Sequence, residues 1–274
     1  MNIIKICTLF LVLWFATGCT NMLFYPLKNH ILLPDQYNIP YENIIFRSFD
    51  NLKLHGWWFP AKKHTNNTVV YIHGNAGNIS THAAGTYWLT NLGYNVFIFD
   101  YRGFGLSEGE VDLKGSIKDI QYAIDWAASR TPENNQLIVI GHSLGASMAV
   151  YSVANHTIKR KIDSLVLISA FSDYRLISRQ LLSRHWLTWG LQWPMSFTIN
   201  NDFRPLDYIG NIAPTPILIM HSPDDATIPY HHAEDLYKNA KQPKNQIKLE
   251  GDHNDIFYYK NNKQLLTNYL NSLM

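Results

Sequence analysis

Residues 137–154 read LIVIGHSLGASMAVYSVA, and this stretch decides the fold. Its first four residues are apolar and predict a strand buried on both faces, and the small residues at its end predict a closely packed helix. Residues 141–145 lie between them and have the form G-x-S-x-G. The glycines permit a strained turn that exposes the Ser143 hydroxyl, and the Leu144 amide then begins the helix, where an oxyanion can be bound. A glycine-rich structural turn with an incidental serine is the alternative.

Segments typical of strands and helices alternate along the rest of the chain. We predict strands at 44–49, 52–59, 68–72, 95–99, 137–140, 164–168, 216–220 and 246–249. We predict helices at 81–92, 116–129, 144–154, 233–240 and 263–274. The first two strands flank Asp50-Asn51, where we predict a hairpin turn. This alternation indicates an α/β fold with a mostly parallel central sheet and helices on both of its faces.

Residues 171–208 break the alternation. Nearly forty residues separate two predicted core strands here, whereas loops of this kind usually have about 2–6 residues. The stretch contains four large aromatic residues, Trp186, Trp189, Trp193 and Phe197. We interpret it as a small lid rather than a sugar-binding platform, and we expect its rings to line an acyl pocket next to Ser143.

A serine hydroxyl becomes a good nucleophile only when a base removes its proton, and a carboxylate must hold that base in the right tautomer. His253 follows the last predicted strand and is the only histidine after the helix predicted at 233–240. Asp224 and Asp225 follow the strand predicted at 216–220. Both places are carboxyl ends of strands, where α/β folds bind their ligands. The residues alone leave open which of the two aspartates is the acid.

Four blocks of sequence resemble those of α/β-hydrolase-fold serine hydrolases, namely HGNAGN at 73–78, DYRGFG at 100–105, GHSLG at 141–145 and GDHND at 251–255. They occur in the order typical of that family, and the resemblance covers about residues 44–274. The H-G-N-A-G strand end is similar to that of one subgroup of α/β-hydrolase-domain proteins.

The resemblance implies roles for further residues. In the family the acid lies five positions into an H-G-x-x-D-x-x-V-P stretch, which favours Asp225 over Asp224, although Ser222 stands where a glycine is usual. The Asn75 amide would be the second oxyanion donor beside that of Leu144; a simple tight turn is the alternative there. Arg102 is expected to brace neighbouring loops, and His142 is expected to be structural.

The first nineteen residues, MNIIKICTLFLVLWFATGC, have the pattern of an export signal. The apolar run at 6–15 is shorter than the roughly 20 residues that cross a bilayer. The segment resembles a bacterial lipoprotein signal, which implies removal of residues 1–18 and attachment of lipid such as palmitate at Cys19. Thr20 after the cysteine then implies the periplasmic side of the outer membrane in the cell envelope. An ordinary cleaved signal or an uncleaved anchor is the alternative.

Composition and missing motifs exclude other classes. The 274 residues carry a net charge of +2, and 46% of them are hydrophobic, which suits a large core and gives no basic stripe for nucleic acid. The sequence has no H-E-x-x-H, no Cys/His cluster, no phosphate loop and no dinucleotide motif. We therefore expect no metal and no cofactor.

Together these observations predict a serine hydrolase anchored by lipid, with residues 1–18 as signal peptide, 19–43 as a lead or tether and 44–274 as the hydrolase domain. We expect a monomer that cleaves carboxylic esters or thioesters of a small-molecule or lipid acyl substrate through Ser143, His253 and Asp225. Carboxylesterase, lysophospholipase and acyl-thioesterase activities all fit. A serine peptidase or aminopeptidase of the same fold is one alternative, and a non-catalytic envelope binding lipoprotein is another.

Overall fold

The computed structural model describes residues 19–63, 65–156 and 161–273. The predicted signal peptide at 1–18 lies outside the described residues. No helix in the described ranges has both the length and the apolar character needed to cross a membrane.

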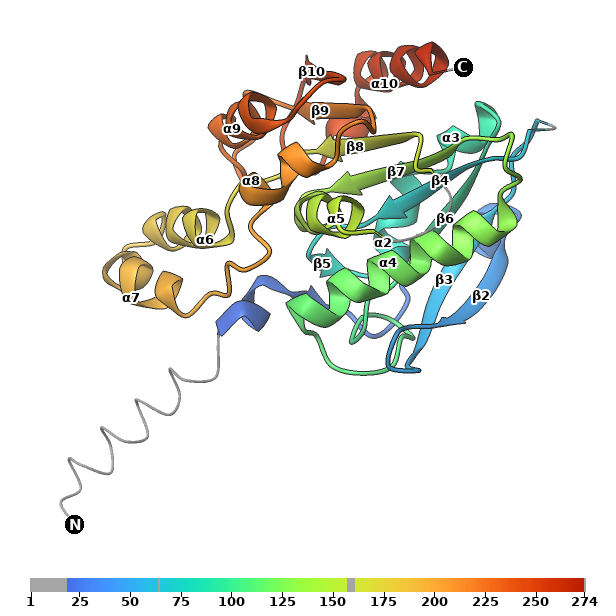
Figure 1. Ribbon diagram of the computed structural model, residues 1–274. Coiled ribbons are helices and arrows are strands. Elements are labelled where there is room, and N and C mark those ends of the chain that lie inside the picture. Colours follow the sequence, from blue (N-terminus) through green and yellow to red (C-terminus); the bar gives the residue numbers. More distant parts are fainter. Residues whose placement is uncertain (1–18, 64, 157–160, 274) are drawn as a thin grey trace.

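The described residues form a sheet of eight strands (Figure 1). In spatial order these are β10 (Lys244–Lys248), β9 (Ile217–His221), β8 (Ser164–Ile168), β7 (Leu137–His142), β4 (Asn67–Ile72), β6 (Tyr94–Phe99), β3 (Lys53–Phe59) and β2 (Glu42–Arg47). The β2–β3 and β3–β6 pairs are antiparallel, and the remaining pairs are parallel. The prediction of a mostly parallel sheet that begins with a hairpin is confirmed.

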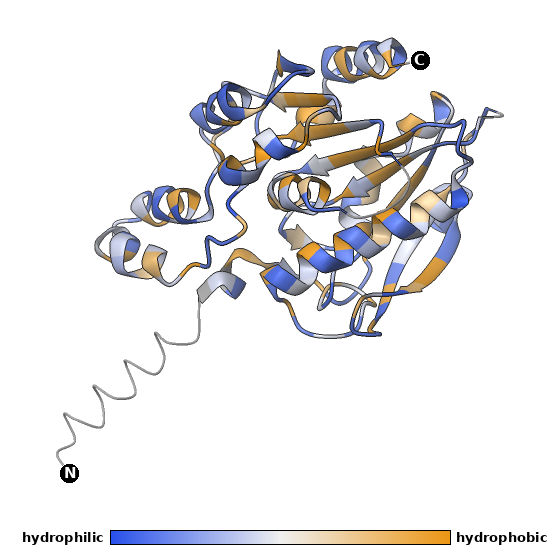
Figure 2. Cartoon of the chain, viewed as in Figure 1, coloured by the Kyte–Doolittle hydropathy of each residue, from blue (hydrophilic) through white to orange (hydrophobic). Residues whose placement is uncertain are grey.

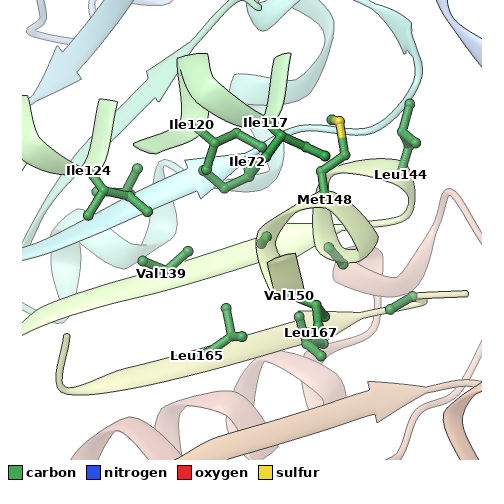
Figure 3. Packing of buried hydrophobic residues seen from close by; sticks show 14 of the residues in the cluster. Ile72, Ile117, Ile120, Ile124, Val139, Leu144, Met148, Val150, Leu165 and Leu167 are labelled. Carbon is green, nitrogen blue, oxygen red and sulfur yellow. The ribbon is translucent and has the colours of Figure 1, made fainter. Parts of the chain in front are cut away.

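Helices cover both faces of this sheet. One face packs against α4 (Leu113–Arg130), α5 (Leu144–Ala154) and α9 (His231–Asn239), and the other against α2 (Ile79–His82), α3 (Trp88–Asn91) and α10 (Lys260–Ser272). Alternate residues of a strand point to opposite faces, so Val70 and Ile72 join the first apolar cluster while Val69 and Tyr71 join the second. Figure 3 shows the first cluster, where side chains of α4 and α5 meet those of β4, β7 and β8. In Figure 2 the central strands are largely orange, whereas α4 carries both colours.

The helix predicted at 81–92 is wrong in detail, because it is broken into α2, a 3₁₀ turn at Ala83–Gly85 and α3. The hydroxyls of Thr86 and Thr90 donate to carbonyl oxygens three residues earlier. Such local bonds compete with the regular pattern of an α-helix. The periodicity of the apolar residues does not show this competition.

The insertion predicted at 171–208 contains α6 (Tyr174–Ser183), a 3₁₀ turn η4 (Trp189–Leu191), α7 (Gln192–Phe197) and α8 (Pro205–Tyr208). α6 and α7 lie together at one side of the molecule, away from the sheet (Figure 1). The insertion therefore has helical structure of its own.

The segment at 19–43, predicted as a lead or tether, packs on the domain. It begins with the 3₁₀ turn η1 (Cys19–Leu23), and β1 (Tyr25–Pro26) then pairs with β5 (Ala76–Gly77). The Asn78 side chain donates to the carbonyl oxygens of Leu27 and Asn29 at 2.9 and 2.8 Å. The lead thus holds the strand end that carries the H-G-N-A-G block.

Candidate active site

Ser143 lies at a sharp turn between β7 and α5. Its backbone has φ 55° and ψ −123°, a conformation that residues other than glycine rarely adopt. The neighbouring glycines explain how the turn fits. A Cβ on Gly141 would lie 2.5 Å from the Ala146 Cα, and one on Gly145 would lie 2.2 Å from the His73 carbonyl oxygen. Only glycine fits at these two places, so the G-x-S-x-G pattern is a steric requirement of this turn.

The structure brings His253 and Asp225 to Ser143. The His253 Nε2 lies 2.9 Å from the Ser143 Oγ, and the His253 Nδ1 lies 2.8 Å from an Asp225 carboxylate oxygen. All three residues are buried. An ionised carboxylate only accepts hydrogen bonds, so Nδ1 carries the proton and Nε2 is free to accept one from the serine. This is the arrangement that general-base activation of a serine requires.

Asp225 is fixed by its own loop. Its second carboxylate oxygen accepts hydrogen bonds from the amides of Thr227 and Ile228 at 2.8 and 2.7 Å. Burial raises the pKa of the Asp225 carboxyl group. The hydrogen bond from His253, the electrostatic attraction of His253 and the hydrogen bond from the Ile228 amide outweigh burial, so the pKa is lowered overall. Asp224 is exposed, and its amide donates to the Ser222 hydroxyl. Asp225, and not Asp224, therefore faces the imidazole.

Asp252 connects the loops that carry the acid and the histidine. One of its carboxylate oxygens accepts from the Ala226 amide at 2.8 Å and from the His253 amide at 2.7 Å. These two backbone hydrogen bonds lower the pKa of the Asp252 carboxyl group. Sequence reasoning missed this residue, because only the fold brings Ala226 beside it.

Asn75 and Leu144, the two predicted oxyanion donors, line one cavity together with Ser143. Leu144 is the first residue of α5, so its amide belongs to the first turn, where amides have no acceptor within the helix. Asn75 follows β4, and its carbonyl oxygen accepts from the Tyr25 amide at 2.9 Å. A Cβ on Gly74 would lie 3.6 Å from the Ser143 Cβ, so this strand end is in direct contact with the serine.

The cavity beside Ser143 has a volume of about 190 Å³ and a largely apolar lining. Its apolar side chains come from several elements and include Leu23, Phe171, Ile177, Leu181 and Ile228. Leu23 belongs to the segment at 19–43, which was predicted only as a lead or tether. No sequence motif around Leu23 indicates that it lines the cavity beside Ser143.

The expectation that the aromatic rings of the insertion line this pocket is wrong. Trp186, Trp189, Trp193 and Phe197 are 81%, 63%, 55% and 67% exposed, and none of them lines the cavity. The reason is the direction of α6. This helix contributes Ile177 and Leu181 to the cavity and then carries the chain away from the sheet, so that η4 and α7, which carry three of these aromatic residues, come after its outer end (Figure 1).

A second cavity of about 490 Å³ adjoins the first. The two share Ala76, His82, His142 and Asn254 in their linings. His142 donates to the His253 carbonyl oxygen at 3.2 Å and stacks on the His253 ring. Burial, and next the nearness of His253, lower the pKa of His142 to about 3. This histidine is therefore neutral at pH 7 and supports the loop of His253.

Two other groups of polar residues do not line the cavity beside Ser143. Arg102 donates to both carboxylate oxygens of Asp119 in α4 and to Asp50 in the turn between β2 and β3. It therefore braces a neighbouring loop, as predicted, and also joins its own loop to a helix. His30, His55 and Asp100 are a group of described residues that could hold a metal ion, since their ligand atoms lie within 4.8 Å of one another. The His30 Nε2 lies 3.4 Å from the Asp100 Oδ2.

The fold and the hydrogen-bonded serine, histidine and aspartate define the class of this protein as an α/β hydrolase. The family model described as "Serine aminopeptidase, S33" matches residues 63–204, and the chain belongs to this family. Among known proteins, the chain is 35% identical over 231 residues to the "Uncharacterized protein YfhR" of Salmonella typhi, with 79% of this chain and 75% of the relative covered.

Two further comparisons extend this result. The chain is 29% identical over 217 residues to the "Lysophosphatidylserine lipase ABHD12" of Mus musculus, which covers 74% of this chain and 53% of that protein. Among solved structures, an esterase of Pyrococcus furiosus superposes with a TM-score of 0.73 at 21% identity, covering 92% of this chain and 98% of the esterase. The second likeness shows the shared fold.

Proposed function

We propose that this protein is a serine hydrolase that cleaves carboxylic ester or thioester bonds of acyl substrates. One observation carries the proposal: the hydrogen bonds of 2.9 and 2.8 Å that join Ser143, His253 and Asp225 at an apolar cavity. A serine hydroxyl with such a base is activated for attack on a carbonyl carbon.

In the proposed mechanism His253 accepts the Ser143 proton while Oγ attacks the acyl carbonyl. The amides of Asn75 and Leu144 stabilise the oxyanion, and each such donor typically contributes about 10²–10³ in rate. The imidazolium, held by Asp225, gives its proton to the leaving alcohol or thiol. Water activated by His253 then releases the acid from the acyl-enzyme and restores the serine.

The lining of the two cavities favours an acyl ester over an aminopeptidase substrate. Recognition of a free peptide amino terminus calls for a carboxylate near the bound ammonium group, since a charged group is costly to bury unpaired. The described residues that line the cavities include no aspartate or glutamate. The name of the lysophosphatidylserine lipase points to the same substrate class.

The experiment compares p-nitrophenyl esters of increasing acyl length with aminoacyl p-nitroanilides. We expect the wild type to hydrolyse the esters and the Ser143→Ala variant to lose this activity by about 10³-fold or more. Turnover of aminoacyl anilides alone would instead support the peptidase. A wild type that hydrolyses neither group of substrates would support a binding protein.

For the location of the enzyme, we propose that lipid attached at Cys19 anchors it to the envelope, with the outer membrane favoured by Thr20. Acyl chains provide membrane affinity in proportion to their length and number. Cells that express the Cys19→Ala variant should incorporate no labelled palmitate into the protein. Unchanged labelling and unchanged membrane fractionation would contradict the anchor.

A further inference from the structure

The insertion presents a group of large apolar side chains to solvent. We define the interfacial patch as Trp186, Leu187, Trp189, Leu191, Trp193 and Phe197, whose exposed fractions run from 47% to 81%. All six lie within twelve consecutive residues, in the turn after α6, in η4 and in α7. A concentration of large exposed apolar side chains in so short a segment is typical of a site of interaction with a protein or a membrane.

The segment that carries the patch has a positive charge between Asp173 and Asp202, which suits an anionic lipid surface. Residues 174–201 contain three arginines and no aspartate or glutamate. The Arg179 guanidinium lies 4.7 Å from the centre of the Trp193 ring, which joins cationic and aromatic groups on one surface. Tryptophan prefers the headgroup region of a bilayer, and nearby basic residues are attracted to anionic lipids.

The amino end of the described chain lies beside the same surface. The Asn200 amide, just after α7, donates to the Thr20 hydroxyl at 2.8 Å. Figure 1 shows η1 next to the segment that follows α7. The residues that precede η1 include the apolar run at 6–15. A lipid attached to Cys19 would therefore be held close to the segment that follows α7 and its patch residues.

The catalytic cavity borders this surface as well. α6 contributes Ile177 and Leu181 to the cavity, and Leu181 is 38% exposed. Leu23 of η1 lines the cavity from the side of the lead. The two elements that flank the patch are thus also walls of the cavity that contains Ser143.

From these observations we infer that the interfacial patch binds the surface of an anionic phospholipid bilayer and holds the cavity of Ser143 toward the lipid. Binding by the patch is independent of catalysis. The consequence that the acyl substrate comes from the bilayer rests on the proposed function. A second copy of this chain is a poorer occupant, because a symmetric pair would bring like arginines together.

The test uses the full chain as the cell processes it, added to vesicles of phosphatidylethanolamine and phosphatidylglycerol that contain lipids brominated in their acyl chains. We expect bromine to quench the tryptophan fluorescence. Replacing Trp186, Trp189 and Trp193 with phenylalanine should remove this quenching while the protein stays bound. Quenching that persists in this variant would come from other tryptophans and would overturn the proposal, as would absence of quenching in the wild type.

A second arm separates docking from catalysis. Replacing the same three tryptophans with serine should lower hydrolysis of an acyl ester held in these vesicles by about tenfold or more, since their burial in lipid is lost. Hydrolysis of a soluble p-nitrophenyl ester should stay within about twofold, because no patch residue lines the cavity. The matched control replaces Tyr37 and Ile45, which are 58% and 59% exposed outside the insertion, with serine.

The outcomes are distinguishable. If the control lowers vesicle hydrolysis as much as the patch variant does, or if the patch variant hydrolyses vesicle-borne ester like the wild type, the docking proposal is wrong. A wild type that inserts its tryptophans but hydrolyses neither ester would refute the proposed function and leave docking supported. Dimers that form in solution through the patch, dissociate in the serine variant and do not bind vesicles would overturn docking in favour of self-association.

Discussion

Replacing Asp225 with asparagine tests the geometry of the site residue by residue. We expect the oxygen of the asparagine side chain to accept the hydrogen bonds from the Thr227 and Ile228 amides. The opposite orientation, with the NH₂ group toward these amides, would lose both hydrogen bonds at a cost of about 1 kcal/mol each. In the expected orientation the NH₂ group faces the His253 Nδ1, which must become an acceptor. The proton moves to Nε2, 2.9 Å from the Ser143 Oγ, and the imidazole can no longer accept the serine proton.

The expected loss in kcat is about 10⁴-fold, which corresponds to about 5.4 kcal/mol of transition-state stabilisation. The assay measures kcat and KM on p-nitrophenyl butyrate at pH 7, with thermal unfolding of each variant to show that the fold is intact. Asp224→Asn is the matched control, because Asp224 is exposed, and its activity should stay within about twofold of the wild type. A loss of less than tenfold in Asp225→Asn, or an equal loss in the control, would refute this reasoning.

Three further predictions concern stability. In urea unfolding, Gly145→Ala should destabilise the fold by about 3 kcal/mol or more, because the new Cβ would clash with the backbone of Ile72 and His73. Gly190→Ala is the control and should change stability by less than about 1 kcal/mol, because a Cβ there would have no neighbour within 4 Å. Arg102→Met should cost about 3–5 kcal/mol in the same assay, because the buried Asp119 carboxylate loses the guanidinium that balances its charge and keeps hydrogen bonds from the Ser48 hydroxyl and the Arg102 amide. Burial lowers the pKa of His232 to about 3, so the unfolded chain binds a proton that the folded chain does not, and stability falls as the pH drops below about 6.5. His232→Gln should therefore show a shallower loss of stability between pH 7 and 5, and an unchanged slope would contradict this.

Local sequence predicted the parts of the fold that depend on local patterns. β4, β7 and β8 are continuous apolar runs because both faces of the sheet are covered, and their predicted ranges nearly match the observed ones. The turn at Ser143 is also recognisable from local sequence. Its two glycines are required because a Cβ on Gly141 would clash with Ala146, and one on Gly145 would clash with the backbone at the end of the adjacent strand β4.

Other features depend on contacts between distant residues. Asp252 binds the Ala226 amide, and Leu23 reaches the cavity because β1 pairs with β5; neither relation leaves a periodic signal. Whether Asp224 or Asp225 faces His253 depends on the path of the loop that follows β9. The aromatic residues of the insertion were expected inside because they are apolar, yet the direction of α6 leaves them exposed.

The most direct measurement of the central claim maps the site at which a fluorophosphonate probe attacks the native protein. Peptide mass spectrometry should find a single adduct, on Ser143, that is absent from Ser143→Ala and forms at least about 10²-fold more slowly in His253→Ala. A wild type that hydrolyses esters without forming this adduct, or a Ser143→Ala variant that is labelled as fast as the wild type, would contradict the account.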